Sequence, residues 1–319
     1  SNEFIDSKDD VPNFGYTDSA YWIKIKYEYK TDLLLDKKRY AIEVFYPLLD
    51  NIEAYQKNRF GNYQVSRRGD SQPFYYRSPL YRNHIIKFDA VPNEPDIIYL
   101  KFQTKGSMRL SLHLLSDDHL IEHISHVELL YGIGFGMLLM MVVYNLFLFF
   151  SLRESVYLNY VFYTLSFLIL QLSLTGYAFE FLWPSNVWLA NYAVSIWAAI
   201  FVLMSLLFLR SLLQTNINLP RVDKYLKVIV TLAVVNIAAS FLVDYGITIR
   251  FLSLISGILA LILISTGIMG VCHGIRSAKY YVVGCVFLWI GIVIYVLMAK
   301  GYVPTNFWTE NGILIAAII

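Results

Sequence analysis

Hydrophobic and polar residues follow two different periods along this chain. Near the N-terminus, AYWIKIKYEYK alternates, with Ile23 and Ile25 on one face of a strand and Lys24 and Lys26 on the other. The stretches HIIKFDAV, IIYLKFQ and MRLSLHLL repeat the period of two, and turn residues separate them. The last stretch predicts a core-facing row of Met108, Leu110, Leu112 and Leu114. Short alternating strands of this kind predict an all-β, jelly-roll-like sandwich over residues 1–116.

The pattern changes near residue 127, where long apolar runs begin. A helix that crosses a membrane needs about 20 mainly apolar residues. Six runs meet this need and a seventh, too short as written, begins near residue 311; the six cover 127–151, 156–182, 187–209, 225–243, 248–272 and 279–299. The sequence therefore predicts an all-α, seven-transmembrane helical bundle over 127–319, with a truncated last span and a linker at 117–126.

Charge and cysteine content support this division. Of the 26 Lys and Arg residues, 17 lie in residues 1–126, as do 18 of the 24 Asp and Glu residues. The N-terminal part thus has the composition of a soluble domain, and the rest that of a membrane domain. The net charge of +2 argues against nucleic-acid binding. Both cysteines lie in the apolar part, so the sandwich must be held by its core and not by disulfides.

Positive residues in the loops predict the orientation. With the sandwich outside the cell, the predicted cytoplasmic loops carry seven Lys and Arg residues: Arg153, Arg210, Arg221, Lys224, Lys227, Arg276 and Lys279. The opposite loops carry two, Arg250 and Lys300. Because cytoplasmic loops are enriched in Lys and Arg, an extracytoplasmic N-terminal domain is favoured, with Arg153 in a tight cytoplasmic turn.

Two sets of motifs resemble one known family. YNLFLFFSLRESVYLNYVFY and QLSLTGYAFEFLWP resemble the bacterial seven-transmembrane receptors with diverse intracellular signalling modules (7TMR-DISM). NFGYTDSAYWIKIKYEYK, YPLLDNIEAYQ and GDSQPFYYR resemble the type 2 extracellular domain of that family. The resemblance implies a jelly roll similar to carbohydrate-binding modules, seven helices, and an output module of the diguanylate cyclase, histidine kinase or phosphatase type. Such a module is expected in cis beyond Ile319 or in trans.

Candidate ligand-binding residues lie in the predicted sandwich. Sugar recognition uses flat aromatic rings for the apolar ring face and charged groups for hydroxyls. The residues that fit these needs are Trp22, Tyr55, Arg67, Asp70, Tyr76, Arg77 and Arg82. A structural interpretation stays open, in which Asp70 caps a turn and Arg77 pairs with it.

Three histidines precede the first apolar run. In a helix, His119, His123 and His126 share a face, where they could bind zinc or titrate near pH 6. A solvated linker without special chemistry is the favoured interpretation, so no metal and no cofactor is predicted. Residues predicted to relay a signal into and along the first span are His119, His123, His126, Glu128, Arg153 and Glu154.

The leading functional hypothesis is a multi-pass sensory receptor of the bacterial inner membrane. Its expected partners are membrane lipids, a small-molecule or glycan ligand, the output module and a second copy of the chain, since outputs of this family often work in pairs. No convincing nucleophile or carboxylate pair is found, so the 319 residues are not expected to be an enzyme. The alternative is a membrane transporter or channel with an accessory β-sandwich binding domain. It is disfavoured because internal repeats and midplane charges are missing.

Overall fold

The computed structural model describes residues 4–7, 11–31, 38–58, 60–239, 241, 243, 245–299, 302–303 and 307–318. These residues form two units. The first comprises Ser1–Glu128 and Ser173–Asn191, and the second comprises Leu129–Leu172 and Tyr192–Ile319. The first unit therefore combines the N-terminal domain with a segment from which 44 residues, 129–172, separate it along the chain.

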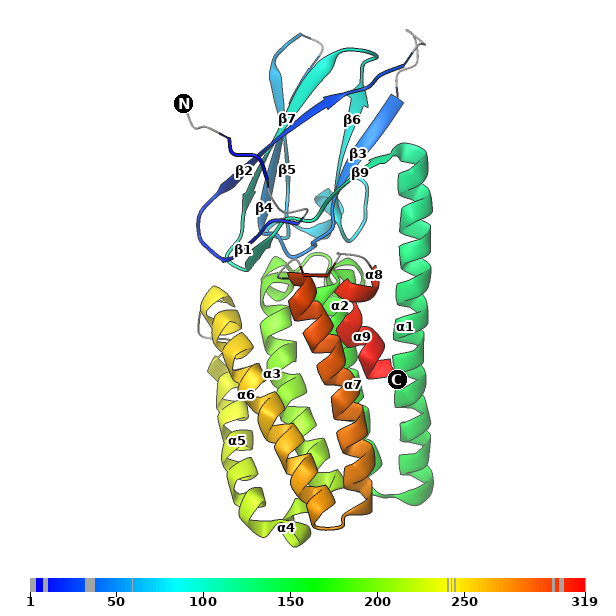
Figure 1. Ribbon diagram of the computed structural model, residues 1–319, viewed down its shortest axis with the longest axis vertical. Coiled ribbons are helices and arrows are strands. Elements are labelled where there is room, and N and C mark those ends of the chain that lie inside the picture. The colour runs from blue at the N-terminus through cyan, green and yellow to red at the C-terminus, as the bar shows by residue number, and fades with distance from the viewer. Residues whose placement is uncertain are drawn as a thin grey trace. The chain divides into compact units, whose positions relative to one another are not determined.

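Antiparallel strands make up most of the first unit (Figure 1). They are β1 (Asn13–Tyr16), β2 (Tyr21–Glu28), β3 (Lys38–Val44), β4 (Asn51–Lys57), β5 (Tyr63–Arg68), β6 (His84–Ala90), β7 (Pro95–Gln103), β8 (Ser107–Arg109) and β9 (Leu112–Ser116), with a short 3-10 helix, η1 (Phe74–Tyr76), before β6. The strands pair in the orders β2-β7-β4-β5, β6-β3-β9 and β1-β8. This confirms the predicted all-β sandwich.

The core of the sandwich is formed by the inward faces of the strands. Ile42, Ile52, Leu100 and Phe102 are almost fully buried there, and the predicted inward residues of β2 pack against them. The predicted core-facing row from Met108 to Leu114 was partly wrong, since Met108 and Leu110 are buried but Leu114 is 55% exposed. Leu114 lies on β9, the edge strand of its sheet, where less of the facing layer covers an inward side chain.

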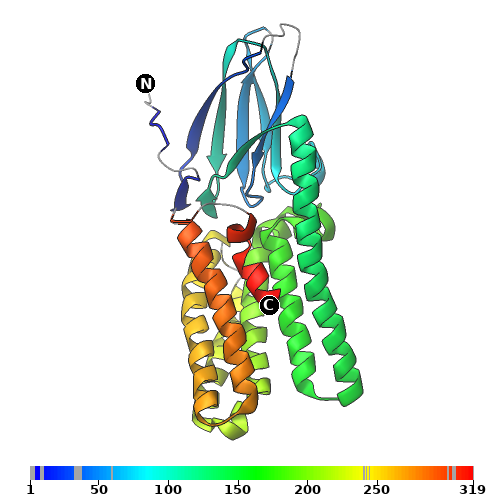
Figure 2. The same ribbon diagram turned by 45° about the vertical axis from the view of Figure 1, so that its right-hand side comes forward.

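Helix α1 (Asp117–Leu152) begins directly after β9 and is unbroken (Figure 2). The predicted linker at 117–126 is therefore the start of this helix. Leu120 and Ile124 pack on Ala41 and Ile85, which lie on the outward face of the β6-β3-β9 sheet. The apolar spacing of three and four residues gives α1 one stripe that covers this face.

The long remaining helices overlap the predicted apolar runs, whereas two short ones, at 215–218 and 307–310, lie between the runs. They are α2 (Ser155–Leu174), α3 (Val187–Leu212), α4 (Thr215–Asn218), α5 (Pro220–Ala239), α6 (Tyr245–Cys272), α7 (Arg276–Ala299), α8 (Phe307–Glu310) and α9 (Gly312–Ile318). Within the described residues, four stretches are long and apolar enough to cross a membrane: Asp117–Leu152, Ser155–Leu174, Val187–Leu212 and Arg276–Ile294. A shorter apolar stretch covers Leu259–Cys272.

The second helix is shorter than the predicted span at 156–182. It ends at Leu174, and Gly176 adopts a positive φ of 86° that a helix cannot continue. A π-helical turn, η2 (Ala178–Leu182), follows. The aromatic residues after Gly176 extend the apolar pattern, but Tyr177 and Phe179 are buried against loops of the first unit.

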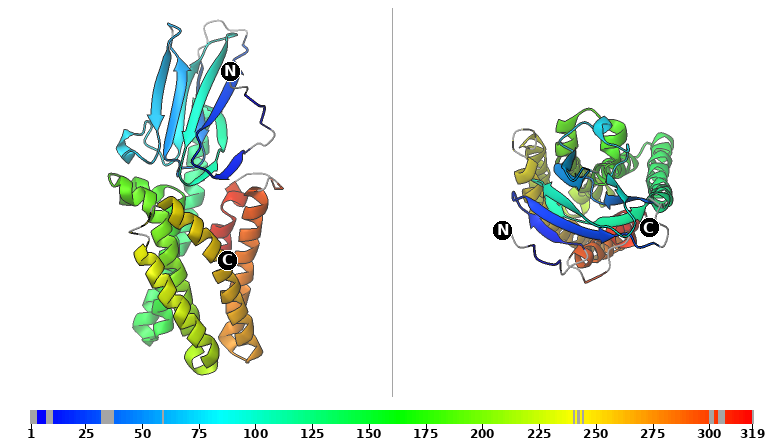
Figure 3. Two further views of the ribbon diagram at one scale, coloured as in Figure 1. Left: turned by 90° about the vertical axis from the view of Figure 1, so that its left-hand side faces the viewer. Right: turned by 90° about the horizontal axis from the view of Figure 1, so that it is seen from above.

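The second unit consists of long helices (Figure 3), and α3, α5, α6 and α7 share one buried apolar cluster in it. Leu206, Leu209 and Leu226 form part of a fully buried cluster between them. At the end of α3, Arg210 Nε lies 2.8 Å from Asp223 Oδ1, so this nearly buried carboxylate is paired. Helix α9 approaches α7 closely at Gly291 and Gly312.

Candidate functional site

The outward face of the β2-β7-β4-β5 sheet carries a row of chemically varied side chains. The strand register places Trp22 opposite Lys101, Lys101 opposite Glu53, and Glu53 opposite Arg67. One row therefore crosses all four strands, because directly opposite residues share a face. Tyr55 lies on the same face in the next row, and its ring centroid is 5.3 Å from that of Trp22.

Glu53 organises the polar half of this row. It accepts a hydrogen bond of 2.8 Å from the Tyr55 hydroxyl and lies 3.2 Å from Arg67 Nε and 3.3 Å from Lys101 Nζ. The hydrogen bond from Tyr55, helped by Lys101 and Arg67, holds the pKa of Glu53 below its usual range. The carboxylate thus stays charged, and a hollow of about 100 Å³ lies against it and Arg67. An aromatic surface beside fixed donors and acceptors suits a hydroxylated ligand.

A larger cleft of about 750 Å³ lies elsewhere in the first unit. Its lining includes Tyr27, Arg39, Lys87, Asp89 and Asp96. These residues come from β2, β3, β6 and β7, so no local sequence pattern could bring them together. The volume is within the usual range for small-molecule sites, about 300–1,000 Å³.

Two basic residues of the cleft also contact the first residue of α1. Lys87 Nζ lies 3.0 Å from Asp117 Oδ1, and Arg39 Nη1 lies 3.9 Å from Asp117 Oδ2. Arg39 also pairs with Asp89 at 3.3 Å. A ligand that pairs with Lys87 or Arg39 would therefore compete with the start of α1.

Three of the predicted ligand residues are buried. Asp70, Arg77 and Arg82 are 4%, 7% and 1% exposed, respectively, whereas Trp22 and Tyr76 are 46% and 68% exposed. Direct contact of the three buried residues with a ligand stays a prediction, and their observed contacts are within the protein. Tyr76 lies on η1, apart from the Trp22 row, with its ring beside that of Tyr75.

Arg82 joins the sandwich to two helical segments. Its Nε lies 3.6 Å from Glu128 Oε1 on α1, and its Nη1 donates to the Thr175 carbonyl at 3.2 Å. The guanidinium also lies over the ring of Tyr177, 5.1 Å from its centroid. Planar stacking and several donors make arginine suited to such a buried junction.

Arg77 lies beside Arg82 and links the same loop to η2. It donates to the carbonyls of Tyr81 and Arg82, and its guanidinium stacks between Phe74 and Phe179 at 4.9 and 5.3 Å from the ring centroids. Burial lowers the pKa of Arg77 to about 10, and the nearby Asp70 opposes that shift. Burial and repulsion from Asp50 raise the pKa of Asp70 well above its usual range.

Glu180, on η2, belongs to the same junction. Burial first and the Glu128 carboxylate second raise its pKa from 4.5 to about 7, while Arg82 and Arg77 act in the opposite direction. The sequence did not mark this residue as a site, because its partners come from two distant segments, the loop that contains Arg77 and Arg82 and helix α1.

The predicted relay residues lie in different surroundings. His119 and His126 are exposed, and His119 Nδ1 is 3.7 Å from Glu122. His123 turns instead toward Glu43 on β3, and Glu128 pairs with Arg82. Arg153 and Glu154 form the turn between α1 and α2, where Arg153 has a φ of 58°. The tight turn is confirmed, and the relay role of these residues stays a prediction.

Comparisons with known proteins agree with the fold. A family model described as 7TM diverse intracellular signalling matches residues 128–319. A second model, described as 7TMR-DISM extracellular 2, matches residues 1–116. No curated protein and no solved structure matches the chain. The two matches cover nearly the whole chain, and the chain belongs to the 7TMR-DISM family of transmembrane sensory receptors with an extracellular N-terminal domain.

Proposed function

We propose that this protein is a multi-pass receptor of the bacterial inner membrane whose sandwich binds a glycan or other hydroxylated small molecule outside the cell. The observation that carries the proposal is the row of Trp22, Lys101, Glu53 and Arg67 across the β2-β7-β4-β5 sheet. Trp22 and Tyr55 supply stacking surfaces, while Glu53 and Arg67 supply an acceptor and a donor for hydroxyl groups.

In this proposal, α1 relays the signal. It carries Asp117, His123 and Glu128 on the side of the sandwich, and the same helix continues to Leu152. A ligand shifts the receptor only as far as its affinities for the two conformations differ. Arg153 and Glu154 are the turn through which α1 passes the change to α2, and a cytoplasmic cyclase, kinase or phosphatase module, in cis or in trans, receives it. A homodimer suits such outputs.

The cleft between Tyr27 and Lys87 is a second candidate for the ligand site. The observation in its favour is that Lys87 and Arg39 are shared with Asp117. An anionic small molecule bound there would weaken these ion pairs and release the start of α1 directly. The two sites differ in chemistry, since the sheet face combines stacked rings with fixed hydrogen-bonding groups, whereas Arg39 and Lys87 line the cleft together with Asp89 and Asp96.

A binding screen with the 319-residue chain in lipid nanodiscs tests the proposal. We expect a glycan or polar metabolite to raise the thermal unfolding temperature, and Trp22→Ala and Arg67→Ala to abolish that shift. Phe60→Ala, at an 88% exposed aromatic residue outside the row, is the matched control. A shift that Lys87→Met removes and Trp22→Ala retains would place the ligand in the cleft. The proposal would be contradicted if no ligand were found whose binding depends on Trp22 and Arg67 of the sheet face or on Lys87 of the cleft.

A further inference from the structure

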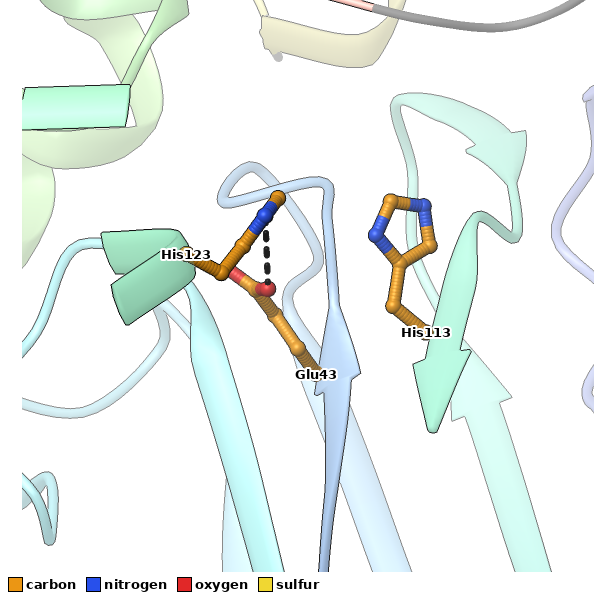
Figure 4. A group of neighbouring side chains, drawn as sticks. All are labelled: Glu43, His113 and His123. Atoms are coloured by element: carbon orange, nitrogen blue, oxygen red, sulfur yellow. Dashed lines mark ion pairs between the residues drawn. The ribbon is translucent and has the colours of Figure 1, made fainter. Parts of the chain in front are cut away.

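A group of three potential metal ligands lies where α1 covers the β6-β3-β9 sheet (Figure 4). It consists of Glu43 on β3, His113 on β9 and His123 on α1, and one ligand atom from each lies within 4.8 Å of the others. Glu43 and His113 are directly opposite in the β3–β9 register. His123 reaches them from above the sheet, with Nε2 3.5 Å from Glu43 Oε2.

The surrounding residues hold these side chains in place. Asn83 Nδ2 donates to Glu43 Oε1 at 2.7 Å, which leaves Oε2 directed toward the histidines. Ser111 Oγ lies 3.4 Å from Nε2 of His113, and Figure 4 shows the other ring nitrogen of His113 turned toward Glu43. The Phe45 ring stacks on the His113 ring at 5.5 Å. Such contacts to the ligand residues, here called second contacts, orient the ligands of a metal site.

One carboxylate oxygen of Glu43 is buried without a hydrogen-bond donor within the described residues. Glu43 is fully buried, and within the described residues its Oε2 has no hydrogen-bond partner. The facing Nε2 of His123 likewise makes no hydrogen bond. A buried carboxylate is stable only when it is paired with a charge or coordinates a metal. The geometry therefore brings one carboxylate oxygen and two imidazole nitrogens within 4.8 Å of one another.

We propose that Glu43, His113 and His123 bind a zinc-class divalent transition metal ion. Two imidazole nitrogens and one carboxylate oxygen are a usual zinc ligand set, with water in the fourth position. Ligand atoms of a tetrahedral site with bonds of about 2.0–2.1 Å lie roughly 3.4 Å apart, which the Glu43–His123 pair already approaches. Mg²⁺ and Ca²⁺ fit poorly because they prefer oxygen ligands. The His123 side chain is 32% exposed and gives the ion a route from solvent.

The metal would join β3 to β9 and α1, which lie about 70 residues further along the chain. Bound to all three ligands, it holds the first turns of α1 against the sheet. The second contacts also connect the site to the Arg82 junction, since Arg82 Nη1 lies 3.4 Å from Asn83 Oδ1. Metal binding does not depend on the proposed receptor function, but an effect of the metal on signalling does.

Zinc titration of the chelator-stripped chain in nanodiscs tests the site. We expect one Zn²⁺ per chain, measured by competition with a chromophoric chelator, and slower hydrogen exchange in residues 117–128 when Zn²⁺ is bound. His123→Ala removes one ligand and is expected to lose roughly 100-fold or more in affinity, above the loss typical for second contacts. Co²⁺ bound at the same site should show the absorption bands of a nitrogen- and oxygen-ligated ion.

His119→Ala and His126→Ala are the matched controls, because both remove an exposed histidine from the same helical segment. They should bind Zn²⁺ as the unchanged chain does. Glu43→Gln keeps the shape and the Asn83 contact and should also lose affinity, which separates ligand loss from unfolding. Zinc binding that is equal in His123→Ala and His119→Ala, or no stoichiometric binding, would overturn the proposal. In the second case, the three side chains would be a buried polar cluster that holds α1 on the sheet without a metal.

Discussion

The two outward faces of the sandwich are built by the same strand alternation and meet different surroundings. On the β2-β7-β4-β5 sheet, Trp22 and Arg67 remain accessible. On the β6-β3-β9 sheet, α1 covers the outward residues, so Glu43 is fully buried and His113 is partly buried. Polar residues therefore remain solvated by water on one face and must find partners within the protein on the other.

The difference also separates two kinds of energetic contribution. Ion pairs of the open face, such as Arg67–Glu53, are solvated and contribute about 0–1 kcal/mol each. The contacts beneath and beside α1 involve buried groups, whose partners cannot be replaced by water. We therefore expect changes on the open face to alter ligand binding, and changes on the covered side to alter the attachment of α1.

The largest expected effect comes from removing a buried charge at the covered side. Arg82→Ala leaves Glu128 without its partner, opens the Thr175 carbonyl and removes a fully buried side chain. We expect a loss of about 3–5 kcal/mol in stability, measured from thermal or denaturant unfolding of the purified chain. Arg67→Ala on the open face is the control and should change stability by no more than about 1 kcal/mol. Equal losses for both variants would remove the distinction between the faces.

The apolar contact of α1 gives the next largest effect. Leu120 is 2% exposed and packs on Ala41 and Ile85, so Leu120→Ala leaves a cavity under the helix. The expected cost is about 2–4 kcal/mol, with faster hydrogen exchange in 117–128. The neighbouring Ile121 is 69% exposed, and Ile121→Ala should have little effect on either measurement. If the two variants behave alike, α1 does not depend on this sheet.

A smaller effect is expected where the segment after α2 meets the sandwich. Gly176 has a φ of 86°, and an added Cβ would lie 2.8 Å from Pro47 Cβ. Gly176→Ala therefore combines backbone strain with a close contact, at about 1–3 kcal/mol. Gly61, with a φ of 79°, has open space around it. Gly61→Ala should cost only the backbone strain, about 1 kcal/mol, and the difference between the two variants in unfolding experiments measures the contact.

The smallest expected effect is a pH dependence of the same junction. The pKa of Glu180 is raised to about 7 in the folded chain, so the protonated side chain stabilises the junction. This stabilisation is fully present below pH 4.5 and is lost as the pH rises through about 7. The charged groups that act on the pKa of Glu180 are Glu128, which raises it, and Arg82 and Arg77, which lower it. Hydrogen exchange in residues 175–186, corrected for its intrinsic pH dependence, should therefore become faster between pH 5 and 8.

Glu180→Gln keeps the shape of the side chain and removes its titration. The variant should show the same corrected exchange at both ends of this pH range. A pH dependence that persists in Glu180→Gln would assign the effect to another group of the junction.

Local patterns predicted much of the fold and part of the candidate site. The alternation of Ile23 with Lys24 placed these residues on opposite faces of β2, because a strand turns successive side chains to opposite sides. The long apolar runs located the helices, since their composition suits lipid. The pattern failed at residues 175–182, where aromatic side chains pack against protein loops and not within the second helix.

The sequence by itself determined the strands, the helices, the family and the presence of Trp22, Tyr55 and Arg67 in the sandwich. Only the tertiary structure placed His123 beside Glu43 and His113, turned Arg82 toward Glu128 and Thr175, and aligned Trp22 with Arg67 across four strands. The reason is physical. Periodicity depends on neighbours along the chain, whereas these groupings depend on strand pairing and helix packing between residues that are tens of positions apart.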